Sequence, residues 1–290
     1  MSRFVHVPVL LTEVLDYLRI EEGAKYIDGT AGGGGHTAEI IKKGGKVLCI
    51  DQDQEAIDHL HARFKDEKKV SIVKGNFFDI RNIARAQGFG DCSGILFDLG
   101  MSSFQIDAST RGFSFLRDQP LDMRMNTQTE LTAHEIVNTW PQDALEEIFL
   151  KYGEEENAKQ VAEAIVVRRK EKKFESTKEL VDVLITLGRS NTAIHPATRV
   201  FQAVRIAVNS ELDVLKIGLA DAAEILGSGG RMVVISFHSL EDRIVKNKFR
   251  ELDQKGTGKV LTKKPVMAGE EETKINRRSR SAKMRVFEKI

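Results

Sequence analysis

The sequence has little cysteine and little proline, and it has no long hydrophobic run. Its 290 residues include two cysteines, five prolines and one tryptophan. Cys49 and Cys92 each lie in or beside an expected strand, so buried thiols in a reducing compartment are favoured over a disulfide. No apolar run approaches the roughly 20 residues that a membrane helix needs, and the N-terminal MSRFVHVPVL lacks the pattern of a signal peptide. We therefore expect a cytoplasmic protein.

Neither sign of charge dominates. The chain carries 44 Lys and Arg against 43 Asp and Glu, a net charge of +1. It is therefore no polycation, and any nucleic-acid site must be a local patch. A hydrophobic fraction of 41% is ordinary for a globular protein, and 290 residues can form one large domain or two smaller ones. The sequence contains no internal repeat and no metal-ligand pattern, so we expect no metal.

The most informative stretch runs from Tyr26 to Asp53, YIDGTAGGGGHTAEIIKKGGKVLCIDQD. It predicts in succession a strand, a glycine-rich turn, a helix and a second strand, at residues 26–28, 29–35, about 36–43 and 46–50. Consecutive glycines let the backbone approach a ligand because no Cβ intervenes, and the following helix points its first N–H groups at that ligand. Asp51 follows at about the interval at which dinucleotide-binding folds place a carboxylate on ribose hydroxyls. We therefore expect an adenosine-containing cofactor.

The glycine pattern also bears on which cofactor binds. It does not fit the GxxxxGK[ST] of a P-loop, and it fits GxGxxG only loosely because Ala31 stands where the second glycine belongs. Asp28, at the end of the first strand, is a second acid beside the turn. An acid there would repel a pyrophosphate, whereas it suits a cofactor with an amine and a sulfonium. S-adenosylmethionine is therefore favoured over NAD, with a glycine-rich turn that binds nothing as the remaining alternative.

A third strand, expected at residues 70–74, ends just before Phe77 and Phe78. In a doubly wound sheet this end lies on the ligand side. One of the two rings could stack on an adenine, and the other is expected in the core.

A fourth strand, expected at residues 94–97, runs into Asp98-Leu99-Gly100-Met101-Ser102-Ser103. Asp98 could bind the cofactor or orient an amine nucleophile. Ser102 and Ser103 offer hydrogen-bond donors and acceptors to a base or a phosphate. A plain turn at the end of a strand is the alternative.

The strand–helix alternation breaks between about residues 107 and 198. The segment Thr110–Met125 interleaves phenylalanines with arginines, namely Phe113 and Phe115 with Arg111, Arg117 and Arg124. This pattern suits stacking on nucleic acid and contact with its charge, and a packed lid is equally compatible. Four helical patterns follow, two of them opened by capping boxes, near residues 132–139, 141–151, 155–171 and 176–187. The basic run Arg168–Lys173 could be a solvated helix end or an RNA-facing patch.

The α/β pattern returns after His195-Pro196. Helices are expected at 197–208 and 211–226, and Arg199 lies near the start of the first. A strand at 231–236 ends before His238, which could touch the substrate or be structural. A last edge strand is expected at 283–289, and the preceding turn, with Arg278 and Arg280, is the best local candidate for binding phosphate.

Several strings of the sequence together resemble one family over nearly the full chain. They are His6-x-Pro8-Val9-Leu10, Asp28-Gly29-Thr30 through Gly35-His36, Asp98-Leu99-Gly100-x-Ser102-Ser103-x-Gln105, Arg111-Gly112-Phe113-Ser114-Phe115, Leu121-Asp122-Met123-Arg124-Met125, Thr198-Arg199-x-Phe201-Gln202-Ala203, Ser236 through Arg243, and Arg280-Ser281-Ala282-Lys283-x-Arg285. The chain resembles the bacterial MraW family of ribosomal RNA cytosine-N4 methyltransferases, the small-subunit rRNA methyltransferases H. It departs from the family pattern at Phe104 and at Gly227-Ser228.

The resemblance implies an α/β fold, a Rossmann-like S-adenosylmethionine-dependent methyltransferase sheet formed by residues 1–106 and 199–290. It also implies a helical insertion at residues 107–198 that recognises the substrate. The cofactor contacts that it implies are Gly34, Gly35, His36, Asp51, Phe77, Asp98 and Gln105. The reaction that it implies is methyl transfer to the exocyclic amine of a cytidine in the decoding region of small-subunit rRNA, within an assembled or assembling 30S particle. The oligomeric state stays open, with a homodimer as one alternative.

This reaction requires activation of the cytosine amine, whose lone pair is delocalised into the ring. Asp98, Ser102 and Ser103 are the candidate hydrogen-bond acceptors that would pull the nitrogen toward sp³ character. The target base must leave its stack. The candidate RNA contacts are Arg111, Phe113, Arg124, Arg199, His238, Arg278 and Arg280. An NAD-dependent oxidoreductase and a catalytically silent RNA-binding assembly factor are the alternative functions.

Overall fold

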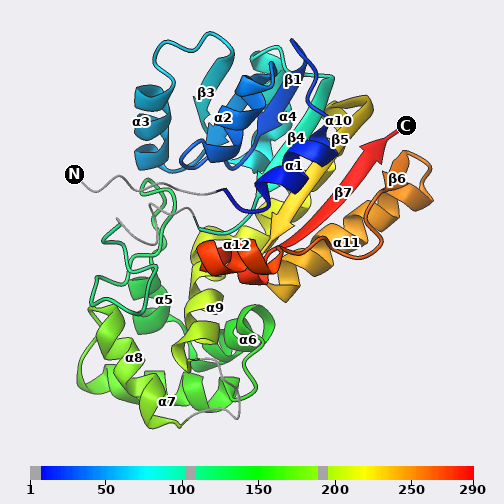
Figure 1. Ribbon diagram of the computed structural model, residues 1–290. Helices are drawn as coiled ribbons and strands as arrows, with labels where there is room; N and C mark the ends of the chain where they lie inside the picture. Colours follow the sequence, from blue (N-terminus) through cyan, green and yellow to red (C-terminus); the bar gives the residue numbers. More distant parts are fainter. Residues whose placement is uncertain (1–7, 102–108, 189–194) are drawn as a thin grey trace. The chain divides into compact units, whose positions relative to one another are not determined.

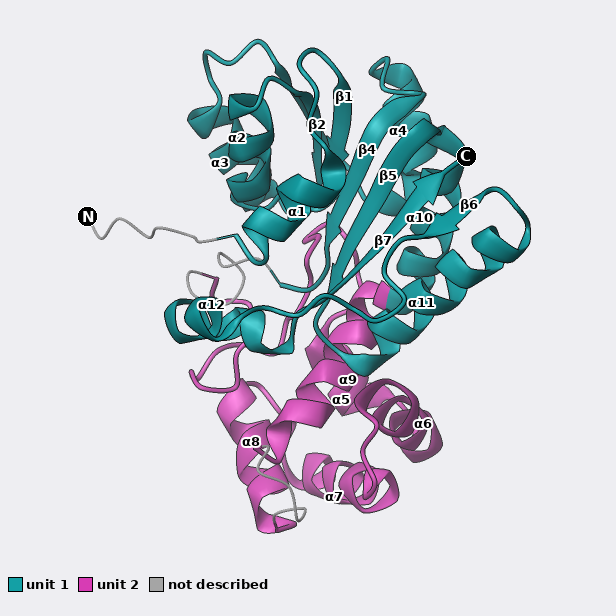
Figure 2. Cartoon of the chain, turned by 45° about the vertical axis from the view of Figure 1, so that its right-hand side comes forward, with its two compact units in different colours: residues 1–103, 212–290 teal, residues 104–211 magenta. Residues whose placement is uncertain are grey.

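The computed structural model describes residues 8–101, 109–188 and 195–290, and the chain forms two compact units (Figures 1 and 2). One unit comprises residues 1–103 and 212–290, and the other comprises residues 104–211. The sequence placed the return to the first unit at residue 199, whereas helix α9 (Ala197–Asn209) lies in the second unit. The physical reason is that α9 packs closely on α6 (Gln142–Gly153), where a Cβ added at Gly153 would come within 2.7 Å of the Arg199 carbonyl oxygen.

The first unit is built on a seven-stranded sheet with strand order β3-β2-β1-β4-β5-β7-β6. The strands are β1 (Lys25–Asp28), β2 (Lys46–Asp51), β3 (Val70–Lys74), β4 (Cys92–Asp98), β5 (Leu226–Ser236), β6 (Gly258–Val260) and β7 (Lys283–Lys289). Strands β1 to β5 pair in parallel, and β7 runs antiparallel to both of its neighbours. The α/β class and the Rossmann-like sheet expected from the sequence are confirmed.

Helices cover both faces of this sheet and make three layers. One face packs against α1 (Leu11–Leu18), α2 (Gly35–Lys42) and α3 (Gln54–Arg63), and the other against α4 (Ile80–Ala86), α10 (Glu211–Ile225) and α11 (Ser239–Gln254). Strand β2 shows why, because Val47 and Cys49 enter the first of these cores while Leu48 and Ile50 enter the second. A strand buried on both faces is apolar at successive positions and not only at alternate ones.

Strand β7 corrects one expectation, since it is not the edge of the sheet. It lies between β5 and β6, and the short β6 forms the edge. Residues 284–287 are all buried. The buried charge of Arg285 is compensated by Asp242 on α11. Nε and Nη2 of Arg285 donate to the Asp242 carboxylate at 2.6 and 3.0 Å.

The second unit is helical, as Figure 2 shows for residues 104–211. Besides α6 and α9 it contains α5 (Ala133–Thr139), α7 (Ala158–Glu171) and α8 (Thr177–Thr186). Thr132 caps α5 by accepting a hydrogen bond from the Glu135 N–H at 3.1 Å. The core contains Phe149 and Phe174, both fully buried. No helix in the described ranges is long and apolar enough to cross a membrane.

The Arg285–Asp242 pair gives a test of the fold. Asp242→Ala is expected to lower the free energy of unfolding by about 3–5 kcal/mol, because it leaves a guanidinium that is 7% exposed without its anion. The matched control is Glu39→Ala, which breaks the exposed Lys42–Glu39 pair and should cost about 1 kcal/mol or less. Urea unfolding measures both, and equal losses would contradict the burial argument.

Candidate cofactor site and candidate nucleic-acid contacts

Three carboxylates end neighbouring parallel strands at the carboxyl edge of the sheet. Asp28 ends β1, Asp51 ends β2 and Asp98 ends β4. The register places Asp28 opposite Cys49 on one side and Leu96 on the other, so the three strands finish within a few residues of one another. Residues 29–34 form the turn between β1 and α2, which starts at Gly35. The structure therefore brings the sequence-predicted Gly34, Gly35, His36, Asp51 and Asp98 into the same unit and onto the same edge.

Asp51 holds the glycine turn in place. Its Oδ2 accepts from the Gly32 N–H at 2.8 Å and its Oδ1 from the Asp53 N–H at 2.9 Å. Burial raises the pKa of Asp51 to about 6, even though the hydrogen bonds from Asp53 and Gly32 act in the opposite direction. The carboxylate thus organises the backbone that a ligand would meet.

The turn needs glycine at defined points. Gly34 has φ +71°, and a Cβ there would lie 2.7 Å from the Phe64 ring and 2.8 Å from Leu60. At Gly29 a Cβ would lie 2.4 Å from the ring of Phe97. The turn is further fixed by Arg63, which donates to the Gly33 carbonyl. The backbone therefore lies tight against its own core and has no room for side chains at these positions.

Asp28 is almost completely buried, with 2% of its surface exposed. Its Oδ2 accepts from the Thr37 hydroxyl at 2.7 Å. Burial is the largest influence on its pKa and raises it to about 6, with a smaller upward contribution from the neighbouring Asp51. Thr37 on α2 is thus a positioning residue that the sequence reasoning missed, and it could have been noticed because it follows the glycine turn directly.

Asp98 is the least satisfied of the three acids. Its backbone N–H donates to the Thr30 hydroxyl at 2.6 Å, but its side-chain Oδ1 is buried and has no hydrogen-bond partner among the described residues. Burial, then repulsion by Asp28 and Glu241, raises its pKa well above the ordinary range of a carboxyl group. A buried acceptor without a donor calls for an explanation, and a ligand that brings an N–H group or a positive charge would supply one.

His36 connects this edge to the chain that precedes α1. Its Nε2 lies 3.0 Å from the Val9 carbonyl oxygen, and because a carbonyl can only accept, Nε2 must carry the proton. Its Nδ1 faces the Asp98 carboxylate, 3.7 Å from Oδ2. The Val9 carbonyl thus orients the His36 ring, which lies beside Asp98.

This arrangement fits the cofactor that the sequence favours. S-adenosylmethionine carries ribose hydroxyls, an amine and a sulfonium, and the edge offers acceptors and negative charge in the form of Asp51, Asp28 and Asp98. The orphaned Oδ1 of Asp98 is the specific sign of fit. A pyrophosphate would meet repulsion from the same three groups.

The two phenylalanines after β3 adopt different positions. Phe77 begins the 3₁₀ turn η1 (Phe77–Asp79), and its ring centroid lies 5.0 Å from that of Phe97. It also packs so closely on α10 that a Cβ at Gly218 would come within 2.5 Å of its ring. Phe78 is the more exposed ring, with 46% of its surface accessible. Phe77 is therefore partly a core residue, and its contact with a cofactor stays a prediction.

Three residues of the predicted site fall outside the described residues. They are Ser102, Ser103 and Gln105. His238, by contrast, is well described: its Nδ1 accepts from the Glu241 N–H at 3.4 Å, and the Glu241 carboxylate accepts from the His238 N–H at 3.3 Å. His238 therefore caps α11, which is the structural alternative that the sequence left open. Its Nε2 is buried and lies 3.2 Å from Oε1 of Glu241.

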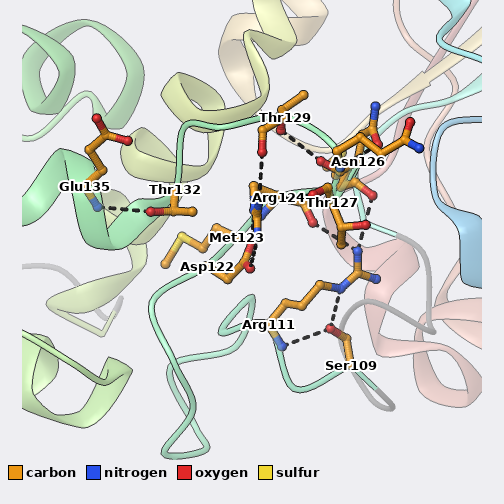
Figure 3. A network of polar contacts seen from close by, with 12 residues as sticks. Ser109, Arg111, Asp122, Met123, Arg124, Asn126, Thr127, Thr129, Thr132 and Glu135 are labelled. Carbon is orange, nitrogen blue, oxygen red and sulfur yellow. Dashed lines mark hydrogen bonds and ion pairs between the residues drawn. The ribbon is translucent and has the colours of Figure 1, made fainter.

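In the helical unit, Arg111 and Arg124 organise the loop that contains them (Figure 3). Arg111 donates to the Ser109 hydroxyl and to the carbonyls of Arg124 and Met125, and its guanidinium lies 5.4 Å from the Phe113 ring. Phe113 is only 5% exposed. These contacts fit the packed-loop alternative for Arg111 and Phe113.

Arg124 makes a bidentate pair with Asp122, with Nε–Oδ1 at 2.9 Å and Nη2–Oδ2 at 2.8 Å. It also donates to the carbonyls of Thr127 and Thr129. Figure 3 shows this pair beside Asn126 and Thr129, at the turn that leads toward α5. The guanidinium of Arg124 thus stabilises the conformation of the loop.

The basic run after α7 is also used internally. Arg168 donates to the Lys172 carbonyl and lies over the Phe174 ring, while Arg169 donates to the Val137 carbonyl. Lys172 pairs with Glu179 at 2.6 Å. These contacts favour a structural role for Arg168–Lys173 over an RNA-facing patch.

Arg199 behaves differently from these arginines. Its Nη1 is buried without a hydrogen-bond partner, the only side-chain atom of the helical unit's described residues in that condition. At the end of the chain, Arg280 is exposed, whereas Arg278 is partly buried and its backbone N–H donates to Asn276 Oδ1 at 3.2 Å. Roles in RNA binding stay predictions for all three.

The glycine turn provides a matched pair of substitutions. Gly34→Ala and Gly88→Ala both place a Cβ at a positive φ, +71° and +72°, but a Cβ at Gly88 meets no atom within 4 Å. Gly34→Ala is expected to lower the free energy of unfolding by about 1–3 kcal/mol more than Gly88→Ala, because it overpacks Phe64 and Leu60. Chemical denaturation measures the difference, and equal costs would mean that the turn has room to move.

The acid cluster predicts an inverted pH effect on stability. Asp98→Asn is expected to raise the melting temperature at pH 7.5 by about 2–4 °C, because it removes a carboxyl group whose ionisation is opposed by burial and by the charges of Asp28 and Glu241. A carboxyl whose folded pKa is raised costs stability above that pKa and costs nothing below its unfolded pKa of about 4. The gain should therefore shrink as the pH falls toward 4. Differential scanning fluorimetry tests this, with the exposed Asp66→Asn as control; a destabilised Asp98→Asn would contradict it.

Comparison with known proteins identifies the family. The model of the MraW methylase family matches residues 3–290. A protein named ribosomal RNA small subunit methyltransferase H from Carboxydothermus hydrogenoformans is 47% identical, with 99% of this chain and 98% of that protein aligned. Proteins of the same name from Clostridium botulinum and Brevibacillus brevis are 43% and 42% identical, with 99% of this chain and 99% and 98% of their own lengths aligned.

Similarity to solved structures is weaker. An rRNA methylase from Streptococcus thermophilus aligns over 99% of both chains at 11% identity, with a TM-score of 0.48. Such a score carries no conclusion about fold or function. The family match and the identities over nearly full lengths are sufficient: they remove the NAD-dependent alternative and confirm S-adenosyl-L-methionine as the cofactor, and the chain belongs to the MraW methylase family.

Proposed function

We propose that this protein transfers a methyl group from S-adenosylmethionine to the exocyclic N4 amine of a cytidine in the decoding region of small-subunit (16S) rRNA. The names of the full-length relatives support the substrate class, and the resemblance of the sequence motifs supports the cytidine amine. The observation that carries the chemistry is the buried, unpartnered Oδ1 of Asp98 beside the glycine turn.

The Asp98 carboxylate suits an amine nucleophile. A cytosine amine is a poor nucleophile, and a hydrogen bond from it to a carboxylate makes the nitrogen more tetrahedral and its lone pair more available. Oδ1 of Asp98 is an acceptor that nothing else in the described chain uses. The methionine amine of the cofactor is a second N–H donor of the same kind, so we propose Asp98 for both the cofactor-binding and the catalytic role. Ser102 and Ser103, which follow in the sequence, stay proposed acceptors.

The remaining cofactor contacts are proposed on the same edge. Bound S-adenosylmethionine supplies an electrophilic methyl group on a sulfonium. Asp51 would accept from the ribose hydroxyls, and Gly34, Gly35 and His36 would line the turn around the methionine part. Phe77 and Gln105 complete the proposed set. These residues hold the reacting atoms in line, and positioning supplies a large part of the rate enhancement in such transfers.

We propose that the helical insertion, residues 107–198, recognises the RNA. The loop shaped by Arg111 and Arg124 presents Phe115, whose ring stacks on His195 with centroids 4.7 Å apart and planes 15° apart. The next residue, Leu116, is 83% exposed. A rigid loop that exposes apolar surface suits contact with a base that has left its stack. Arg199, His238, Arg278 and Arg280 stay proposed contacts, while Arg111, Phe113 and Arg124 would act by shaping the loop.

The proposed substrate is rRNA within an assembled or assembling 30S particle in the cytoplasm. The decisive experiment supplies labelled S-adenosylmethionine to small subunits from cells that lack this protein and analyses the product nucleosides by mass spectrometry. N4-methylcytidine at one site is expected. A methyl on carbon 5 would contradict the amine mechanism. Cofactor binding without any incorporation would favour the silent assembly factor.

Asp98→Ala separates the two roles of that carboxylate. Loss of methyl transfer together with at least a tenfold weaker affinity for S-adenosylmethionine is expected, because the variant loses an acceptor in a buried site. Calorimetric titration gives the affinity, and single-turnover transfer at saturating cofactor gives the rate. An unchanged affinity with lost transfer would move Asp98 to a purely catalytic role.

A further inference from the structure

A corner of the first unit exposes an apolar side chain among basic ones. Helix α12 (Glu270–Ile275) and the 3₁₀ turn η3 (Arg277–Ser281) lead into β7, and we call residues 270–281 the α12–η3 corner. Ile275, the last residue of α12, is 77% exposed. Single exposed apolar side chains are common on protein surfaces, so Ile275 gains significance only together with the fixed backbone and the cations beside it that are unpaired in the described chain.

The corner is held in one shape. Asn276 N–H donates to the Glu272 carbonyl at 2.7 Å, and the Asn276 carbonyl accepts from both the N–H and the hydroxyl of Ser279, at 3.0 and 2.8 Å. Ser279 is fully buried. Glu272 also accepts from the Leu10 N–H at 2.8 Å, which ties the corner to the start of α1. Ile275 is therefore presented by a fixed backbone.

The charges beside Ile275 are available for a ligand. Lys274, Arg277 and Arg280 are exposed, and none of the three forms an ion pair with any residue of the described chain. This distinguishes them from Arg111, Arg124 and Arg168, whose guanidinium groups are used inside the helical unit. The acids of the corner, Glu270 to Glu272, lie in the first turn of α12, at the opposite end from Ile275.

One apolar residue among cations matches RNA better than protein. A stable protein interface buries about 800 Å² on each side, far more than a single isoleucine offers. A single-stranded RNA presents the apolar faces of its bases, which an exposed aliphatic side chain can cover, and phosphates that bind cations. We propose that the α12–η3 corner is an RNA-docking element, in which Ile275 packs on an unstacked base and Lys274, Arg277 and Arg280 bind phosphates. The inference rests on the proposed function for its choice of rRNA.

The apolar contact is tested by Ile275→Ala, with Ile217→Ala as the matched control. Ile217 is an isoleucine of the same unit, on α10, and is 51% exposed. We expect Ile275→Ala to weaken binding to extracted small-subunit rRNA by about three- to tenfold and Ile275→Leu to restore it. Ile217→Ala should bind as the wild type does. Filter binding measures the affinities, and titration with S-adenosylmethionine verifies that each variant is folded.

The phosphate contacts are tested by the salt dependence. Each contact with a phosphate contributes about 0.7–0.9 to the slope of log K against log salt concentration. Arg277→Ala and Arg280→Ala are each expected to reduce that slope by about this amount, while Ile275→Ala should lower affinity without changing the slope. Wild-type slopes in both arginine variants would overturn the proposal.

The outcomes also separate this inference from the proposed function. If the wild type binds rRNA but transfers no methyl, and Ile275→Ala still weakens binding, the docking element stands and the proposed reaction fails. If Ile275→Ala binds rRNA normally, the docking element fails whatever the methyl transfer shows. Weaker binding to whole small subunits with normal binding to extracted rRNA would assign the contact to a ribosomal protein and overturn the RNA reading.

Discussion

The gathering of three carboxylates at one edge of the sheet is the constraint on which the first unit depends. Like charges that are buried close together destabilise a fold unless hydrogen bonds or a counter-charge offset them. Asp51 is offset by backbone N–H groups and Asp28 by the Thr37 hydroxyl, whereas Oδ1 of Asp98 has no partner in the described part of the chain. The unrelieved cost is therefore concentrated on Asp98. Under the proposed function, the cationic cofactor would be the counter-charge, and relief of this cost would contribute to the free energy of binding.

Asp51 shows how the same carboxylate can serve both the fold and the ligand. An ionised carboxylate has about four lone-pair sites, and backbone hydrogen bonds from Gly32, Asp53 and Gln52 do not use all of them. The others can accept from ribose hydroxyls without releasing the turn. The turn is thus in place before the ligand arrives, which reduces the ordering cost of binding.

Local patterns in the sequence were sufficient for the βαβ unit and insufficient where long-range contacts decide. Periodicity and glycine positions predicted the strand, glycine turn and helix from Tyr26 to Lys42, but they did not show that Asp51 and Arg63 hold the turn in place. The place of β7 depends on pairing with β5 and β6, and the charged residues between its apolar ones suggested an edge. The choice between Phe77 and Phe78 depends on Gly218, some 140 residues away along the chain, whose missing side chain admits the Phe77 ring.

The basic residues show the same limit. The sequence shows that Arg111, Arg124 and Arg168 are basic, but it cannot show that backbone carbonyls, Asp122 and aromatic rings already bind them. These three are therefore less suited to RNA than exposed cations without an ion pair in the described chain, such as Arg277 and Arg280. Because acids nearly equal the basic residues in number, non-specific attraction to RNA is expected to be weak. Under the proposed function, selection of one nucleotide among many would then depend on shape: a loop and a corner that are held by hydrogen bonds, and a buried acceptor at Asp98 that a correctly placed amine would reach.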